Sequence, residues 1–181
     1  MLPPRVTKAS RTVPKSFRID ESALRALEAE ASSLNVSLNT LVNQILKQYA
    51  EFDRFARMIS TVKFSSAPFR GLLSAADVNQ LIEVAKAAGS SIPQAFVTAK
   101  RGKVDLDSLI DHVRSLAKYA QLFEFSDTVD SHGHVITLIH DYGLNWSIFL
   151  VHYLTAMLAL IGTSPKLEMS DRSVIIAIPG A

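Results

Sequence analysis

Residues 12–19 have the alternating pattern of a β-strand, yet no second strand is predicted close to them in the sequence. Phe17 and Ile19 flank Arg18, and Pro14 limits the strand to a sheet edge or to a strand start. The backbone donors and acceptors of a lone strand need a partner, and a strand of this length is not stable by itself in water. The fold must therefore supply a partner for this strand.

Two short helices are predicted directly after the strand. Asp20 and Ser37 are residue types that cap helix N-termini, and apolar residues follow each of them at three- and four-residue intervals. Asn35 tolerates the left-handed conformation that closes many helices, so the turn between the two helices is short. The second helix is predicted to continue to about Arg57 or to be followed by a separate helix. The apolar positions are Leu24, Leu27, Ala31 and Leu34 in the first helix and Leu38, Leu41, Val42, Ile45, Tyr49 and Phe52 in the second.

The run FRIDESALRALEAEASSLNVSLNTLVNQIL, from Phe17 to Leu46, resembles the ribbon-helix-helix family of transcriptional regulators, the Arc, MetJ and CopG type. The resemblance lies in the order and spacing of strand, capped helix, tight turn and second capped helix, and it covers about residues 12–55. It implies a cytoplasmic homodimer or higher homo-oligomer, in which two strands pair as an antiparallel ribbon in the major groove of double-stranded DNA. The implied function is sequence-specific transcription regulation. The alternative is an ordinary β-α-α fragment of a larger core.

The resemblance also implies roles for individual residues. Alternation places Phe17 and Ile19 on the side that faces the helices. It places Pro14, Ser16 and Arg18 on the side that faces the groove. There Arg18 can distinguish a guanine by about 1–3 kcal/mol, and the N-terminus of the second helix is expected to bind a phosphate. Pro14 lacks a donor and Lys15 replaces a residue that is often apolar in the family, so the ribbon is predicted to be short or to begin at Lys15. The residues expected to contact DNA are Arg11, Lys15, Ser16, Arg18, Ser37 and Asn39.

The positive charge of the chain is concentrated at its N-terminus. Residues 1–19 contain five Lys or Arg and no acidic residue, whereas residues 61–181 contain ten basic and eleven acidic residues. Such a segment can neutralise phosphates, and its attraction to nucleic acid weakens with salt. Residues 1–11 are predicted to be a basic, flexible tail, and a transit peptide is the alternative interpretation.

Residues 12–59 are predicted to form the ribbon-helix-helix domain and residues 62–181 a second, α+β domain for oligomerisation or effector sensing. Ser74 with Asp77 resembles a capping box for a helix that ends before Gly89. A short helix is predicted from Pro93 to Gly102, and another begins at about Asp105. Four strands follow, and they are predicted to form an antiparallel β-β-α-β-β sheet with helices on one face. The strands are Gln121–Val129, His134–Asp141, Lys166–Ser170 and Ser173–Ile178.

The apolar segment Leu144–Thr163 lies between the two predicted hairpins and approaches the length of a membrane span. It carries polar residues such as Asn145 and His152, and its neighbours alternate like strands. We therefore expect a buried helix of a soluble domain and no membrane partner. The helix is apolar on nearly every side, which predicts cover by the sheet and by a second protomer, with an apolar effector as the alternative.

Three histidines lie on and before the second predicted strand. His134 and His140 share a face but are about 20 Å apart, so one metal ion cannot bridge them within the strand. His132 and His134 could still form a site with residues of another chain. A polar turn and a hydrogen-bonded core histidine are the favoured interpretation, so neither a metal site nor a cofactor is predicted.

The sequence argues against catalysis and leaves three other functions open. It contains no Cys, phosphate loop, nucleophile elbow, zinc-protease helix or dinucleotide fingerprint. Asp105, Asp107 and Asp111 have the spacing of a helix start and its exposed face. The alternatives to a free-standing regulator are an antitoxin that masks a toxin, a metal-responsive regulator that uses His132 and His134, and a nonspecific architectural DNA-binding protein. The sequence does not decide whether the second domain binds a small-molecule or metal effector.

Overall fold

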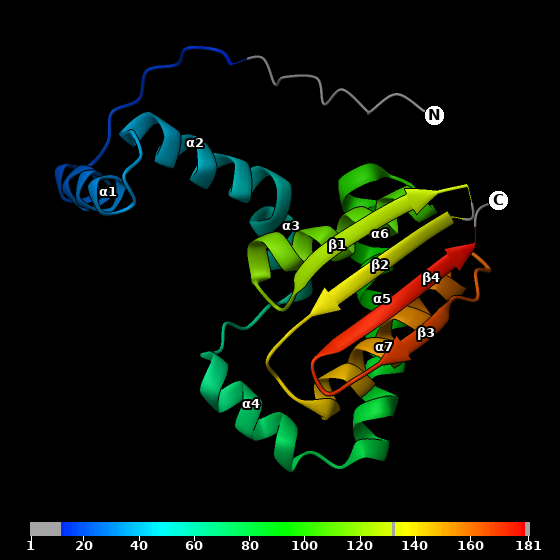
Figure 1. The fold of residues 1–181 in the computed structure, drawn as a ribbon. Coiled ribbons are helices and arrows are strands. Elements are labelled where there is room, and N and C mark those ends of the chain that lie inside the picture. The colour runs from blue at the N-terminus through cyan, green and yellow to red at the C-terminus, as the bar shows by residue number, and fades with distance from the viewer. Residues whose placement is uncertain (1–11, 132, 180–181) are drawn as a thin grey trace. The chain divides into compact units, whose positions relative to one another are not determined.

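The computed structural model describes residues 12–131 and 133–179 of the 181-residue chain (Figure 1). The chain divides into two compact units, Met1–Ile45 and Leu46–Ala181, which we call unit 1 and unit 2. Together they give a mixed fold of helices and one four-stranded antiparallel sheet, in agreement with the predicted α+β class.

Unit 1 contains the two capped helices that the sequence predicts. In α1 (Glu21–Ser33) the Asp20 carboxylate accepts hydrogen bonds from the backbone N–H groups of Ser22 at 2.9 Å and Ala23 at 3.2 Å. Asn35 has a φ of 55°, so the left-handed residue after the first helix is confirmed. In α2 (Leu38–Gln48) the backbone N–H of Thr40 donates to the Ser37 hydroxyl at 3.1 Å, which confirms the second cap.

Residues 12–20 form neither a helix nor a strand in the single chain. The predicted strand over residues 12–19 is therefore not confirmed. A ribbon made by two chains requires the second chain, so the strand stays a prediction.

The helical run of α2 crosses from unit 1 into unit 2. It continues as a π-helix, η1 (Tyr49–Asp53), then α3 (Arg54–Ala56) and a 3₁₀ turn (Arg57–Ile59). The rings of Phe52 and Phe55 each lie 5.7 Å from the ring of Phe96, measured between centroids. The boundary between the compact units thus lies earlier than the predicted domain limit at residues 59–62, because these aromatic side chains belong to the core of unit 2.

The sheet of unit 2 has the predicted β-β-α-β-β order. Its strands are β1 (Glu124–Asp130), β2 (Gly133–Ile139), β3 (Lys166–Met169) and β4 (Ser173–Pro179), in the spatial order β1-β2-β4-β3. All neighbouring pairs are antiparallel. The long helices α5, α6 and α7 lie on one face of the sheet (Figure 1). This arrangement confirms the prediction of an antiparallel sheet with helices packed on one side.

Two helices differ from their predictions. Residues Ser66–Ala75 form α4, which was not predicted, and Ser74 lies inside it rather than at a helix start. The next helix, α5 (Val78–Arg101), begins at the Asp77 cap and runs without interruption through Gly89 and Pro93 to Gly102. The prediction of two separate helices between Asp77 and Gly102 is therefore wrong. The left-handed Gly102, with a φ of 71°, is the true end of the helix.

The core of unit 2 lies between the sheet and its helices. α6 (Leu106–Ser115) has the Asp105 cap that the sequence predicts, and it passes into a second π-helix, η3 (Leu116–Ala120). α7 (Leu144–Ala159) is the predicted apolar helix, and it buries Trp146, Tyr153 and Met157. No helix in the described ranges is both long enough and apolar enough to cross a membrane.

Candidate nucleic-acid interface

The segment that carries the predicted DNA-reading side chains is exposed and precedes α1. Lys15, Ser16 and Arg18 are all exposed, and no hydrogen bond or ion pair links them to other residues in the described ranges. Arg11, the remaining basic residue of the predicted set, lies outside the described residues. The three described side chains are therefore available to an external partner.

The start of α2 presents the second part of the predicted interface. The Ser37 hydroxyl bonds the Thr40 backbone N–H and the Thr40 hydroxyl, and the Asn39 side-chain oxygen accepts from the Asn43 amide at 3.2 Å. The backbone N–H groups of Leu38 and Asn39 have no acceptor in the part of the chain that the structure describes. Free N–H groups at the positive end of a helix dipole form a local anion site.

Unit 1 leaves most of its apolar side chains uncovered. Among residues 12–45, only Ala31 and Leu41 are buried. Phe17 is 68% exposed and Ile19 is 45% exposed, although both are predicted to face a core. Leu34 and Ile45 are also exposed. A folded unit with this much uncovered apolar surface is typical of a protein that pairs with another copy or with a partner.

The histidines do not form a metal site in the described residues. His134 Nδ1 donates to the Asp127 carboxylate at 3.0 Å, and Arg114 lies 3.6 Å from the same carboxylate. His132 lies outside the described residues, so a site shared between His132, His134 and another chain stays untested. Residues 12–131 and 133–179 contain no group of three or more His, Asp or Glu placed to hold a metal ion.

His140 is the hydrogen-bonded core histidine that the sequence predicts. It is 4% exposed, its Nδ1 accepts from the backbone N–H of Tyr142 at 3.3 Å, and its Nε2 lies 2.9 Å from the Ser147 hydroxyl. Because Nδ1 is an acceptor, the ring proton is on Nε2 and the ring is neutral. Burial lowers the pKa of His140, in agreement with a neutral ring.

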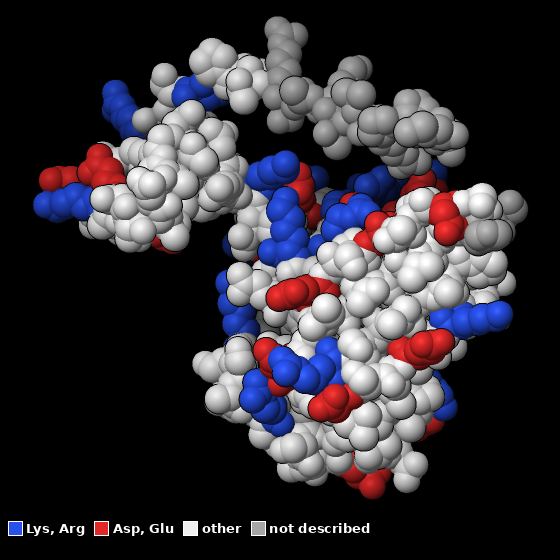
Figure 2. All heavy atoms as spheres, viewed as in Figure 1, with Lys and Arg blue, Asp and Glu red and all other residues white. Residues whose placement is uncertain are grey.

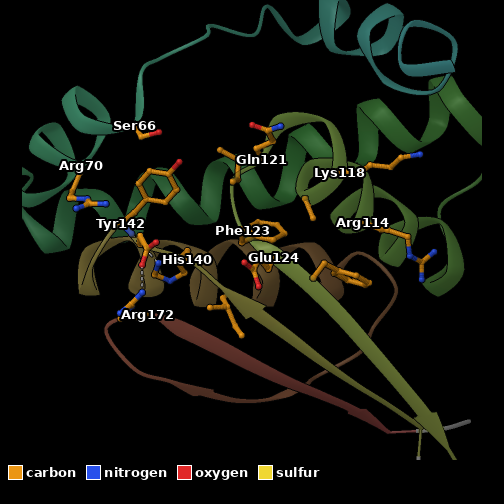
Figure 3. A pocket seen from close by; sticks show the side chains of 15 residues that line it. Ser66, Arg70, Arg114, Lys118, Gln121, Phe123, Glu124, His140, Tyr142 and Arg172 are labelled. Atoms are coloured by element: carbon orange, nitrogen blue, oxygen red, sulfur yellow. Dashed lines mark hydrogen bonds and ion pairs between the residues drawn. The ribbon is translucent and has the colours of Figure 1, made fainter. Parts of the chain in front are cut away.

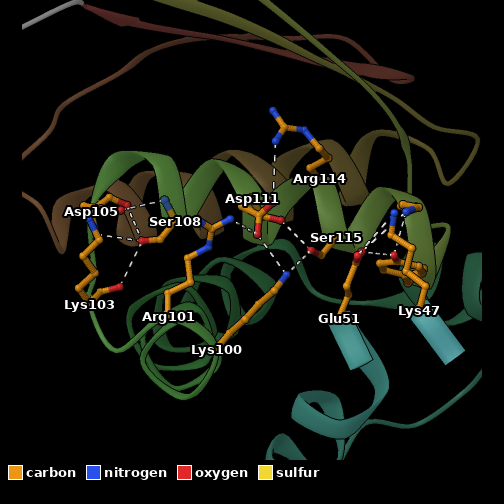
Figure 4. Close-up of polar contacts among 12 residues, drawn as sticks. Lys47, Glu51, Lys100, Arg101, Lys103, Asp105, Ser108, Asp111, Arg114 and Ser115 are labelled. Carbon is orange, nitrogen blue, oxygen red and sulfur yellow. Dashed lines mark hydrogen bonds and ion pairs between the residues drawn. The ribbon is translucent and has the colours of Figure 1, made fainter. Parts of the chain in front are cut away.

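Two aspartates, Asp105 at the start of α6 and Asp111 within it, have structural partners (Figure 4). Asp105 caps the helix, and its pKa is lowered to about 2, first by the hydrogen bond from Lys103 and then by those from Ser108. Asp111 binds Lys100 at 3.1 Å and Arg101 at 2.9 Å. Burial raises the pKa of Asp111, but the hydrogen bonds from the two cations outweigh burial and the pKa lies below its usual value. These contacts hold α5 against α6.

Two π-helices contact each other beside this network. The Tyr119 hydroxyl of η3 donates to the Glu51 carboxylate of η1, and the rings of Tyr119 and Phe52 stack at 5.6 Å. Lys118 lies 3.8 Å from Glu51, and Lys47 lies 3.7 Å from it (Figure 4). Burial and the hydrogen bond to Glu51 raise the pKa of Tyr119, so the hydroxyl keeps its proton at neutral pH. The sequence contains no signal of this contact.

Charges are mixed over the visible face of unit 2. In Figure 2 the Lys and Arg side chains are interspersed with Asp and Glu side chains on that face. A mixed surface does not attract nucleic acid as a field of one sign does. The segment before α1 thus stays the candidate interface.

Comparison with models of known protein families, with curated proteins and with solved structures found no match.

Proposed function

We propose that this chain is a sequence-specific, DNA-binding transcription regulator that acts as a dimer. Two copies pair residues 12–19 as an antiparallel β-ribbon, and the ribbon enters the DNA major groove. One observation carries the proposal: an exposed basic segment with uncovered Phe17 and Ile19 is followed directly by two capped helices with a tight turn. The unit is the ribbon-helix-helix domain that the sequence resembles.

Dimerisation supplies the partner that the segment lacks. Pairing two segments satisfies the backbone groups of both, and it covers Phe17 and Ile19 against the helices of the two chains. Full burial of one such side chain contributes about 1.5–3 kcal/mol. Four of these side chains per dimer provide a substantial part of the energy that the association needs.

The two parts of the interface have different tasks. Arg18 and Ser16 are proposed to contact base edges, and Lys15 and Arg11 to contact phosphates. The N–H groups at the start of α2, with Ser37 and Asn39, are proposed to fix the ribbon on the DNA backbone. Base contacts give sequence preference, and phosphate contacts give position and salt dependence.

Unit 2 is proposed to be the oligomerisation or effector-sensing part of a cytoplasmic regulator. Its core is independent of residues 12–20, and it retains a cleft of about 840 Å³ that is lined entirely by its own residues. Regulators gain a response to their surroundings when such a unit is joined to a DNA-binding unit.

Selection of bound DNA from a random pool tests the proposal. The full-length protein is expected to enrich a motif with two-fold symmetry, since a symmetric dimer reads two equivalent half-sites. Affinity for the selected DNA is expected to fall steeply with salt. Recovery of no enriched motif, with binding that is equal for all sequences, contradicts sequence-specific regulation and favours an architectural role.

A further inference from the structure

A cleft of about 840 Å³ opens at one edge of unit 2 (Figure 3). Its walls come from segments far apart in the sequence: α4, the end of α6 with η3 and the residues that lead into β1, the end of β2 with the loop after it, and the β3–β4 turn. The volume is sufficient for a small organic molecule. The sequence gives no indication of the cleft, because its lining segments are far apart in the sequence and do not belong to one sequence motif.

The charges that line the cleft are predominantly positive. The lining contains four cationic and two acidic side chains, and most of them are engaged with each other or with neighbours. The cations are Arg70, Arg114, Lys118 and Arg172, and the acids are Glu124 and Asp141. Arg172 pairs with Asp141, and Lys118 with Glu51 outside the cleft. Arg70 has no ion-pair partner within the described ranges, so one guanidinium is left for a ligand.

One end of the cleft combines this guanidinium with uncharged donors and with the Arg172–Asp141 ion pair. Figure 3 places Arg70, Tyr142 and Arg172 near one another, with Ser66 at the start of α4 above them. His140 lies in the wall of the cleft. It is neutral and its ring nitrogens are already hydrogen-bonded, so it adds no charge to the cleft. An oxyanion at this end would meet a fork of N–H donors from Arg70, a geometry that suits carboxylate and phosphate oxygens.

The rest of the cleft offers apolar surface. Leu122, Phe125 and Ile139 also line it. The Arg114 guanidinium lies 5.3 Å from the centroid of the Phe125 ring, and its charge is offset by Asp111 and Asp127. A ligand with an apolar, planar body could pack here while its charged group binds Arg70.

The helix that carries Arg70 is anchored to the core. The Asn145 side chain of α7 donates to the backbone carbonyls of Leu73 at 2.7 Å and Ala76 at 3.4 Å, where α4 ends. Phe69, one residue before Arg70, packs edge-on against Trp146 at 5.4 Å. Arg70 is therefore presented from a fixed element.

We propose that this cleft binds a small organic oxyanion with an apolar body, and that Arg70 binds the anionic group. The carboxylate and the phosphate forms of such a ligand share this chemistry. The proposal concerns unit 2 alone, so it stands or falls independently of DNA binding.

Ligand-observed NMR on the full-length protein tests the site with phenyl phosphate and with benzoate, and benzyl alcohol serves as the neutral control of similar shape. Emission of Trp146, the single tryptophan of the chain, gives a second readout because its ring lies 6.0 Å from that of Tyr142 in the cleft wall. At least one anion is expected to bind, and benzyl alcohol is not. The anion that binds identifies the preferred group.

The matched variants are Arg70→Gln and Arg25→Gln, since both remove one exposed arginine and only the first lies in the cleft. Arg70→Gln is expected to weaken binding about tenfold or more, as the loss of a charge-assisted hydrogen bond predicts. Arg25→Gln is expected to have no effect. The proposal is overturned if neither anion binds, if benzyl alcohol binds as well as the anions, or if the two variants weaken binding equally.

Discussion

Gly89 of α5 lies so close to Tyr153 of α7 that a Cβ atom at position 89 would be 2.2 Å from the Tyr153 carbonyl oxygen. Glycine is the only residue that allows the two helix backbones to approach this closely. Four residues later Pro93 is buried inside the same helix, and its missing N–H leaves the Gly89 carbonyl without the usual helical bond. The packing against α7 thus overrides two residues that ordinarily end a helix.

Gly89→Ala is expected to destabilise the protein, although the same change stabilises an unhindered helix. The new methyl group must push α5 and α7 apart, which costs about 1–3 kcal/mol of unfolding free energy. Gly71→Ala is the matched control, because Gly71 is also helical and a Cβ there meets nothing within 4 Å. It is expected to add about 0.5–1 kcal/mol. Denaturant unfolding measures both, and equal effects of the two substitutions would contradict the close approach.

Acid is expected to weaken the fold through His112. This side chain is 1% exposed, and burial lowers its pKa from 6.5 to about 4, with a smaller contribution from Lys100. As the pH falls from 6.5 to 4, the unfolded chain takes up a proton that the folded chain does not. The free energy of unfolding therefore decreases through this window, by about 3 kcal/mol.

A paired substitution isolates this contribution. His112 Nε2 lies 2.9 Å from the Tyr153 hydroxyl, and either single removal leaves a buried polar group without its partner. The double variant His112→Leu/Tyr153→Phe removes both groups together and is expected to cost less than the sum of the single variants. Unfolding curves collected from pH 7 to about pH 4 provide the measurement. If the double variant keeps the acid sensitivity of the wild type, His112 is not its source.

The contact between the two π-helices is expected to contribute measurably to stability. Tyr119→Phe removes the hydroxyl that donates to Glu51 and should lower the unfolding free energy by about 1 kcal/mol. Tyr49→Phe, in the neighbouring π-helix, is the control because Tyr49 is exposed and has no hydrogen bond through its hydroxyl in the described ranges. Its effect is expected to stay within about 0.5 kcal/mol. Equal losses in thermal or denaturant unfolding would show that the Glu51 bond contributes nothing.

Ile19→Ser is expected to weaken the proposed dimer. Ile19 is one of the uncovered apolar residues of unit 1, and its burial between two chains contributes about 1.5–3 kcal/mol per side chain. Val62→Ser changes an apolar residue of unit 2 that is more exposed still, and it should leave association unchanged. Sedimentation velocity over a range of concentrations compares the two variants. A wild-type protein that is monomeric at every concentration would contradict the proposed ribbon.

The local signals in the sequence predict much of the fold. Asp20, Ser37 and Asp105 cap helices as expected, because a cap depends only on residues one turn away. The four strands follow from their alternation, and the starts of both later strands, Lys166 and Ser173, are confirmed. Helix α4 was not predicted. Pro68 does not exclude a helix there, because it lies in the first turn, a position that tolerates proline.

The remaining features depend on contacts between distant residues. Gly89 leaves room for the close approach of Tyr153 in α7, and the cleft arises only where Arg70, Phe125 and Arg172 are brought together by the fold. The proposed ribbon requires a second chain, so a single chain does not test it. Local sequence patterns do not report which residues, far apart in the sequence, come close together in the fold.

Competition between selected and random DNA, measured for the wild type and for Arg18→Ala, tests the central claim most directly. The wild type is expected to prefer the selected sequence, and Arg18→Ala is expected to reduce that preference by about tenfold or more while nonspecific affinity changes little. Arg25→Ala, which removes an exposed arginine of α1, should retain the preference. A wild type without any preference, or an equal loss of specific and nonspecific affinity in Arg18→Ala, would contradict the claim that the ribbon reads bases through Arg18.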